Sequence, residues 1–164
     1  MAGAAIEERV RAELDRLGTQ HAEIECDPAY ADTAAFCERY GYAPEESANT
    51  IIVAARREQG VACACVALAT TRVDVNHAVC GLLGVRRASF APAELTQELT
   101  GMMIGGVTPF ALPPSLPLYI DAAVMARPHV IVGGGSRSVK LRLPPSALLA
   151  LPGAQVVEGL ARTA

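Results

Sequence analysis

Two glycine-dense segments in the second half of the chain constrain its fold most strongly. The first is Gly101-Met-Met-Ile-Gly-Gly-Val-Thr-Pro109 and the second is Gly133-Gly134-Gly135, with the short acidic segment Leu118-Tyr-Ile-Asp121 between them. β-Branched residues flank the glycines, whereas a flexible linker would carry repeats of serine or proline. The segments therefore indicate folded backbone that turns sharply and lies close to other atoms. Exposed N–H groups on such turns can hold an oxygen that becomes negative during a reaction, so we expect the functional site here.

The composition limits the class of protein. A length of 164 residues fits one domain, residues 1–164, and hydrophobic residues make up 51% of it while aromatic residues make up only 4%, so the core must be aliphatic. No run of about 18 apolar residues is free of charges and turn residues, so we expect no membrane span. Acidic residues near the N-terminus disfavour a signal peptide, and we expect a cytoplasmic protein. The net charge of −3 disfavours a broad basic face for DNA or RNA but allows a local contact with an RNA end.

The five cysteines are an odd number, and without an export signal we expect reduced thiols. Cys63 and Cys65 are two residues apart in a predicted strand and share one face of it. They lack the C-x-x-C spacing of a zinc knuckle or a redox pair. We interpret both as small core residues, and a thiol or metal role for the pair is the weaker alternative.

Hydrophobic periodicity predicts short helices that alternate with strands. An amphipathic helix is expected at about residues 5–18, packed on the domain, and an antiparallel hairpin at 49–55 and 61–69. The other predicted helices are at 34–40, 75–83, 95–99 and 147–151, and the other strands are at 21–26, near Ile104, and at 119–120, 130–132 and 139–143. In the last strand the alternation predicts that Lys140, the only lysine, and Arg142 face solvent. This order predicts a mixed α+β domain.

The glycine motif, the Leu-Tyr-Ile-Asp segment and the triglycine, in this order, resemble the YbaK/ProX family of aminoacyl-tRNA deacylases. These are editing domains, either free-standing or inserted in prolyl-tRNA synthetases. The resemblance spans roughly residues 31–160 and implies a curled, mostly antiparallel mixed β-sheet surrounded by short helices. It also implies hydrolysis of the ester that joins a wrong, small amino acid to the 3′ end of a tRNA. The expected partner is aminoacyl-tRNA, with an aminoacyl-tRNA synthetase as a further candidate and no membrane or DNA partner; no cofactor and no metal are expected.

The resemblance also assigns site residues. Gly105 begins the Gly-x-x-x-Pro motif of the loop whose backbone holds the terminal ribose and the reacting ester. Asn49 stands where relatives carry a functional lysine, and its amide can hydrogen-bond but carries no charge. We expect Asn49, Gly105 and Gly106 to form the catalytic group, which acts through backbone amides and substrate positioning because the ester is already activated. The expected substrate contacts are Thr50, Val107, Thr108, Pro109, Asp121, Gly134, Gly135, Ser136, Arg137 and Ser138.

Structural roles remain open for several of these residues. Asp121 either caps a helical turn or recognises the α-amino group of the substrate. Arg137 is either a phosphate contact or a solvated surface residue. Because Asn49 replaces the lysine, the alternative function is a catalytically weakened module that binds an aminoacyl-adenosine or a tRNA 3′ end without efficient hydrolysis.

Overall fold

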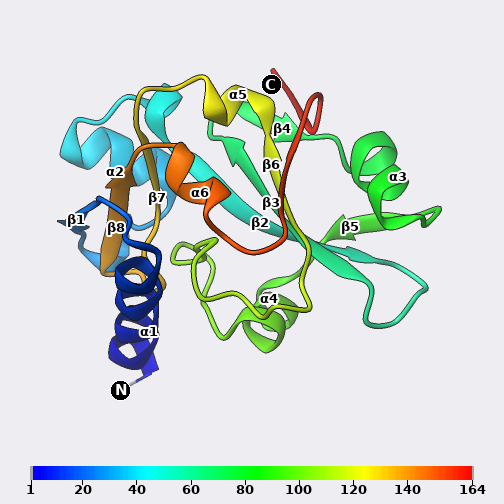
Figure 1. The fold of residues 1–164 in the computed structure, drawn as a ribbon, viewed down its shortest axis with the longest axis horizontal. Helices are drawn as coiled ribbons and strands as arrows, with labels where there is room; N and C mark the ends of the chain where they lie inside the picture. The colour runs from blue at the N-terminus through cyan, green and yellow to red at the C-terminus, as the bar shows by residue number, and fades with distance from the viewer. Residues whose placement is uncertain (1, 164) are drawn as a thin grey trace.

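A five-stranded sheet forms the centre of the molecule, which a computed structural model describes for residues 2–163 (Figure 1). The strand order is β5-β2-β3-β6-β9. These strands are β2 (Ala48–Ala55), β3 (Ala62–Leu68), β5 (Ala88–Phe90), β6 (Leu118–Asp121) and β9 (Ala154–Val157). The hairpin of β2 and β3 is antiparallel, as predicted, and runs from the pair Ala48↔Leu68 to the pair Ala54↔Ala62. β6 runs parallel to both of its neighbours, β3 and β9, so the sheet is mixed.

A second, three-stranded antiparallel sheet lies beside the first. Its order is β1-β8-β7, formed by β1 (Ala22–Glu25), β8 (Val139–Leu143) and β7 (Val130–Gly133). A parallel bridge between Ser47 and Ile131 joins the start of β2 to β7. β4 (Thr71–Val73) and β10 (Ala161–Thr163) form a separate antiparallel pair. The α+β class with short helices around a mixed sheet is therefore confirmed.

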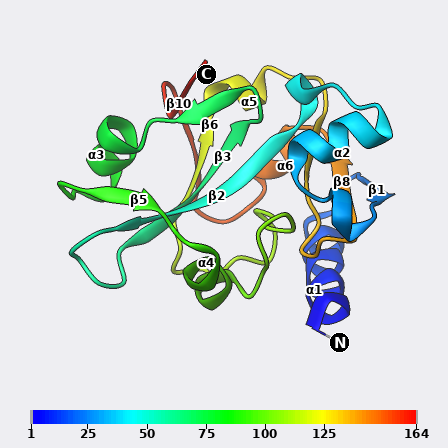
Figure 2. The same cartoon turned by 180° about the vertical axis from the view of Figure 1, so that it is seen from behind.

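The helices are short except for the first. They are α1 (Ala2–Leu17), α2 (Thr33–Tyr40), the π-helical turn η3 (Val75–Val79) with α3 (Cys80–Leu83), α4 (Ala93–Thr100), α5 (Ala122–Met125) and α6 (Ser146–Leu149), with 3-10 turns η1 (Pro28–Tyr30) and η2 (Pro44–Glu46). Gly41 and Gly101 end α2 and α4 with φ angles of 77° and 74°, a left-handed conformation that only glycine adopts readily. In Figure 2, β5 lies at one end of the molecule, and α2, β8 and β1 lie at the other end.

The main core lies between α1, the central sheet and the glycine segments. Val10 and Leu14 of α1 are 1% and 0% exposed and belong to the same buried cluster as Phe110, Ile120 and Leu141. Cys63 and Cys65 belong to a second cluster, with their Sγ atoms 3.8 Å apart on one face of β3. Within residues 2–163 no further His, Cys, Asp or Glu gathers around them as a metal site would require. No helix in this range is long and apolar enough to cross a membrane.

Two expectations for local structure are wrong. Residues 104–106 form a turn instead of the start of a strand, because the Gly106 N–H donates to the Met103 carbonyl at 2.9 Å. Lys140 does not face solvent: it is only 6% exposed, whereas Arg142 is exposed. Strand alternation predicts which residues share a face, but it does not predict whether another segment covers that face. The segment before α2 and the first glycine turn cover the face that carries Lys140.

Candidate functional site

The two glycine segments lie directly against each other. The Gly135 N–H donates to the Gly106 carbonyl at 2.8 Å. A Cβ atom on Gly133 would overlap the carbonyl of Val107, and one on Gly106 would overlap the backbone of Ser136. The glycines therefore allow two backbones to pack where any side chain would separate them.

A pocket of about 310 Å³ lies beside this contact, at an edge of β2. β5 covers that edge only from the pair Val53↔Phe90 onward, while Ala91 N–H donates to the Ile52 carbonyl at 2.8 Å. The pocket occupies the uncovered part of the edge, before the bridge from Ser47 to β7. Its lining comes from both glycine segments, β2, α2, α4, β8 and the end of β5: Asp32, Thr33, Ala48, Asn49, Thr50, Ile51, Ile52, Phe90, Ala91, Thr96, Ile104, Gly105, Val107, Gly133 and Lys140.

The ammonium group of Lys140 is the buried charge of the pocket. Nζ donates to the carbonyls of Ala31 at 2.6 Å and Gly105 at 2.9 Å, and it lies 5.6 Å from the centre of the Phe36 ring. Burial lowers the pKa of this ammonium below the ordinary value for lysine. An ammonium has three N–H donors, so these two hydrogen bonds leave one for a bound molecule.

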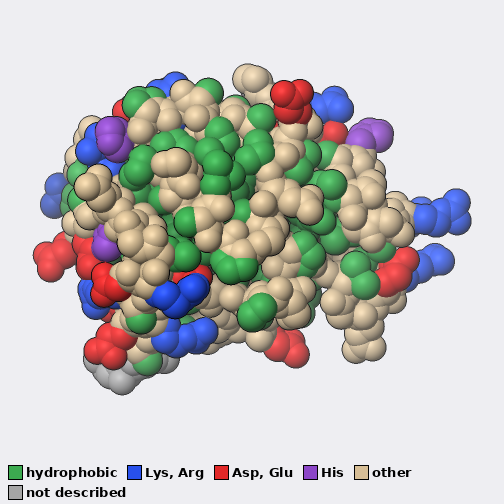
Figure 3. Space-filling model, viewed as in Figure 1, with side chains coloured by type: hydrophobic (Ala, Val, Ile, Leu, Met, Phe, Trp, Pro, Cys, Tyr) green, Lys and Arg blue, Asp and Glu red, His purple; other side chains and the backbone are tan. Residues whose placement is uncertain are grey.

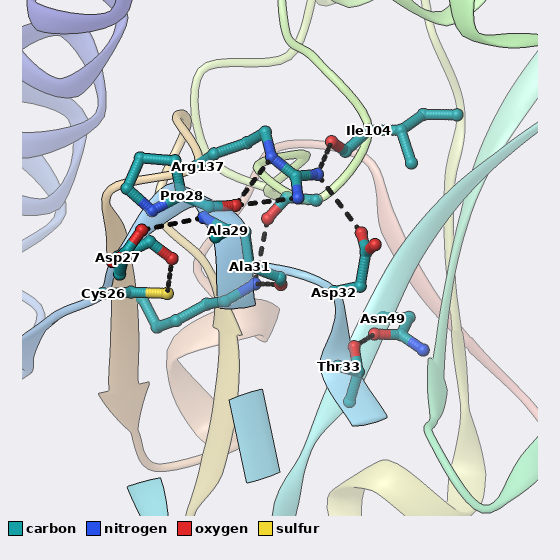
Figure 4. A network of polar contacts seen from close by, with 12 residues as sticks. Cys26, Asp27, Pro28, Ala29, Ala31, Asp32, Thr33, Asn49, Ile104 and Arg137 are labelled. Carbon is teal, nitrogen blue, oxygen red and sulfur yellow. Dashed lines mark hydrogen bonds and ion pairs between the residues drawn. The ribbon is translucent and has the colours of Figure 1, made fainter. Parts of the chain in front are cut away.

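Several polar side chains of the pocket lining take part in the hydrogen bonds and ion pairs drawn in Figure 4. The Thr33 hydroxyl donates to Oδ1 of Asn49 at 2.5 Å, which leaves the Asn49 amide N–H groups available as donors. The carboxylate of Asp32 is 70% exposed and forms an ion pair with Arg137 at 3.2 Å. Arg137 also donates to the carbonyls of Pro28 and Ile104. It therefore ties the segment before α2 to the first glycine turn, and four of its five N–H donors are occupied.

Thr50 and Thr96 belong to the inner wall of the pocket. The pocket wraps around the edge of β2, because consecutive residues 48–52 of this strand all line it. Side chains alternate along a strand, so Ala48, Thr50 and Ile52 lie on one face of the sheet, and Asn49 and Ile51 lie on the other. The Thr50 Oγ1 atom is buried and has no hydrogen-bond partner within the described residues. Such an unpaired buried hydroxyl typically costs about 1–3 kcal/mol.

Residues 27–151 match the aminoacyl-tRNA editing domain family. The chain belongs to this family. Two solved structures resemble this editing domain over nearly its whole length. A proposed trans-editing enzyme for prolyl-tRNA synthetase is 26% identical with a TM-score of 0.78, and the match covers 93% of this chain and 94% of the other. The hypothetical protein APE2540 is 27% identical with a TM-score of 0.83, and the match covers 94% and 99% of the two chains.

The editing domain brings only part of the expected site together. Asn49, Thr50, Gly105 and Val107 line the pocket, and Gly133 lines it from the second glycine segment. Asp121 lies outside it and caps α5, with its carboxylate accepting from the N–H groups of Ala123 at 3.3 Å and Ala161 at 3.1 Å. The structure therefore shows the capping role of Asp121, which its position at the end of β6 also predicts.

The remaining expected contacts support the fold around the pocket. The Gly106 N–H is occupied in its own turn, so it is not a free donor for a substrate. Gly135 packs against Ile6 and Val10 of α1, and the Ser136 hydroxyl donates to Glu7 at 3.0 Å. The expected contacts that do not line the pocket are Gly106, Thr108, Pro109, Asp121, Gly134, Gly135, Ser136, Arg137 and Ser138.

Sequence reasoning missed Asp32, Thr33, Phe90 and Lys140 as pocket residues. They come from three separate segments, so no motif spacing connects them. The only available signal was that Lys140 is the single lysine of the chain.

The contact between the glycine segments predicts the effect of a methyl group there. We expect Gly133→Ala to lower the free energy of unfolding by about 1–3 kcal/mol, because its Cβ would overlap the Val107 carbonyl. Gly81→Ala is the matched control: Gly81 lies in α3 with no atom within 4 Å of an added Cβ. Its alanine variant should be unchanged or more stable by up to about 1 kcal/mol. Urea denaturation of both variants measures the difference, and equal stability would contradict the close contact.

Proposed function

We propose that this editing domain hydrolyses the ester between a small, wrongly attached amino acid and the 3′-terminal ribose of a tRNA. The buried Lys140 ammonium beside the Gly105 turn is the observation that carries the proposal. It provides positive charge and directed N–H donors in a pocket that is large enough for an aminoacyl group and its ribose, but not for the rest of a tRNA.

The reaction requires a water molecule and stabilisation of negative charge. Water attacks the ester carbonyl, the C–O bond to the ribose breaks, and the ribose oxygen leaves with a proton. The carbonyl oxygen becomes negative before the bond breaks, and fixed donors in a site shielded from water stabilise it. The third N–H of Lys140 is the candidate donor, together with the N–H of Gly105. Losing one such donor typically costs about 10²–10³ in rate.

Lys140 supplies the charge that Asn49 cannot. The resemblance to the deacylase family implies that Asn49 stands where relatives carry a functional lysine, and both Asn49 and Lys140 line this pocket. The ammonium therefore comes from β8 instead of β2. Asn49, held by Thr33, keeps its amide N–H groups for a ribose hydroxyl or the ester carbonyl.

Asp32 is the candidate partner for the α-ammonium of the substrate. Its carboxylate lies at the mouth of the pocket, mostly exposed, and Arg137 fixes its position. We therefore assign recognition of the α-amino group to Asp32 instead of Asp121, because the Asp121 carboxylate already accepts two backbone hydrogen bonds at the cap of α5.

The pocket favours a small acyl side chain. Its inner wall combines Ile52, Ala91 and Val107 with Thr50. A synthetase separates side chains that differ by one methylene by only about 1–3 kcal/mol, so a second, size-limited pocket is useful. The similarity to a proposed trans-editing enzyme for prolyl-tRNA synthetase makes the errors of that synthetase the first substrates to test.

A module that binds without hydrolysis is the second candidate, because Asn49 replaces the lysine. We expect deacylation above the spontaneous rate for at least one tRNA in a panel mischarged with alanine, serine, threonine or cysteine. Release of labelled amino acid measures the rate. Binding of tRNA without acceleration for any substrate would favour the binding module.

Substitution of Lys140 tests the source of the charge. We expect Lys140→Met to lower kcat by about 10²–10³, because one donor and its charge are lost. The double variant Lys140→Met/Asn49→Lys should recover part of this loss, because it returns an ammonium to the same pocket. Single-turnover deacylation assays measure both variants. Activity of Lys140→Met equal to that of the wild type would rule out this role.

The pKa of Lys140 predicts a pH dependence. Only the protonated form carries charge, so its contribution to the rate is lost as the pH rises through the pKa. Because burial lowers this pKa, the loss should begin at a lower pH than for an exposed lysine. The decline should be absent from Lys140→Met after subtraction of spontaneous hydrolysis at each pH.

Substitution of Asp32 tests recognition of the substrate amine. We expect wild-type protein to prefer a free α-amino group over an N-acetylated one by about tenfold or more, as hydrogen bonds to charged groups are worth about 1.5–3 kcal/mol. Asp32→Asn should reduce this preference by raising KM for the free amine alone. Comparison of kcat/KM for the two substrates measures it, and an unchanged ratio would contradict the assignment.

A further inference from the structure

Four arginines gather at the end of the molecule that is farthest from α1. Arg56 and Arg57 lie in the loop between β2 and β3, and Arg86 and Arg87 lie just before β5. The Arg56 N–H donates to the Arg87 carbonyl at 3.0 Å, which holds the two segments together. All four side chains are exposed, and a hollow between the segments is lined by Arg57, Glu58, Arg86 and Arg87. Figure 3 shows basic side chains projecting at this end of the molecule. We call these four residues the arginine cluster.

Within residues 2–163 the arginine cluster forms no ion pair with a carboxylate. Arg11, Arg16, Arg137 and Arg162 form ion pairs with carboxylates. Among the described residues, Glu58 is the one carboxylate that lines the hollow. The chain as a whole carries a net charge of −3, so this concentration of positive charge is local.

A single β-ribbon connects the arginine cluster to the pocket. β5 pairs with the end of β2 from Ala55↔Ala88 to Val53↔Phe90. Phe90 lines the pocket at one end of this ribbon, and Arg87 lies three residues earlier, about 10 Å away at the usual rise per residue. Phe90 is 49% exposed, so its ring is accessible where it lines the pocket.

We propose that the arginine cluster binds the phosphate backbone of the nucleotides that precede the 3′-terminal adenosine of the tRNA. This inference rests on the proposed function, which places that adenosine in the pocket. Guanidinium groups match phosphate geometry through paired N–H donors, and such contacts orient RNA without reading its sequence. The exposed Phe90 ring offers a stacking surface for a base between the pocket and the arginines. The cluster is thus the local basic contact that a protein of net negative charge requires for an RNA end.

The salt dependence of tRNA binding tests this surface. We expect Arg57→Gln/Arg87→Gln to reduce the slope of log K against log salt for deacylated tRNA by about 1.4, since each single-stranded phosphate contact contributes about 0.7. At 0.15 M salt the affinity should fall about tenfold. The matched control is Arg9→Gln/Arg142→Gln, which removes the same charge from exposed positions on α1 and β8 and should keep the wild-type slope. Arg57→Lys/Arg87→Lys should also keep most of it, because the charges remain.

Hydrolysis provides a second measurement. With a mischarged tRNA, the Arg57→Gln/Arg87→Gln variant should raise KM about tenfold and leave kcat at saturation unchanged. The ratio of kcat/KM for the tRNA to that for an aminoacyl-adenosine, which has no phosphate, should fall by the same factor. Circular dichroism confirms that each variant is folded.

The outcomes separate this inference from the proposed function. In one outcome the wild type hydrolyses a mischarged tRNA, but the Arg57→Gln/Arg87→Gln variant has the same salt slope and the same KM as the control variant. This result would overturn phosphate binding by the arginine cluster and leave the proposed deacylase function intact. A cluster-dependent slope without hydrolysis of any mischarged tRNA would overturn the deacylase and support the tRNA surface. Cluster-dependent binding to vesicles of phosphatidylserine, with none to tRNA, would overturn the assignment to RNA.

Discussion

The backbone of residues 105–107 lies directly against that of residues 133–136, and the pocket depends on this contact. Glycine at positions 106 and 133 makes the approach possible, since a Cβ atom at either would overlap the opposite backbone. The approach carries the Gly105 turn to the edge of β2, where β5 leaves the strand uncovered. A pocket thus forms between the edge of the sheet and the turn. The two glycine segments pack mainly against each other, and the pocket forms beside this contact.

Lys140 and Arg137 hold the first glycine turn in this position. Both belong to the segment that follows the triglycine, and both reach carbonyl groups of the turn and of the segment before α2. Buried cations are costly unless they are hydrogen-bonded, so the two carbonyls on Lys140 offset part of the cost of burying it. The same bonds point its ammonium at the pocket wall. Lys140 therefore stabilises the turn, and in the proposed reaction the same ammonium supplies the positive charge.

The family and most of the elements could be predicted from local patterns. Helix ends such as Gly41 and Gly101, the hairpin of β2 and β3 and the cap at Asp121 each depend on neighbouring residues, so their signals are local. The missed strands β4, β5, β9 and β10 have only three or four residues, too few for a periodic pattern. Most of the pocket lining was missed for a different reason. Asp32, Phe90 and Lys140 meet only through long-range packing, which no spacing in the chain records.

The order of glycines, prolines and apolar residues by itself determined the α+β fold, the family and the region of the site, because these depend on backbone geometry and local periodicity. Only the tertiary structure decided which groups face the pocket. Lys140 is buried, although the strand pattern predicts that it faces solvent, and the Gly106 N–H is occupied by a hydrogen bond within its turn. The Asp121 carboxylate is occupied at a helix cap, whereas the Asp32 carboxylate is mostly exposed beside the pocket. The physical reason is that the exposure of a side chain and the occupancy of its hydrogen bonds depend on which distant segment packs against it. The local sequence of a segment does not specify that packing partner.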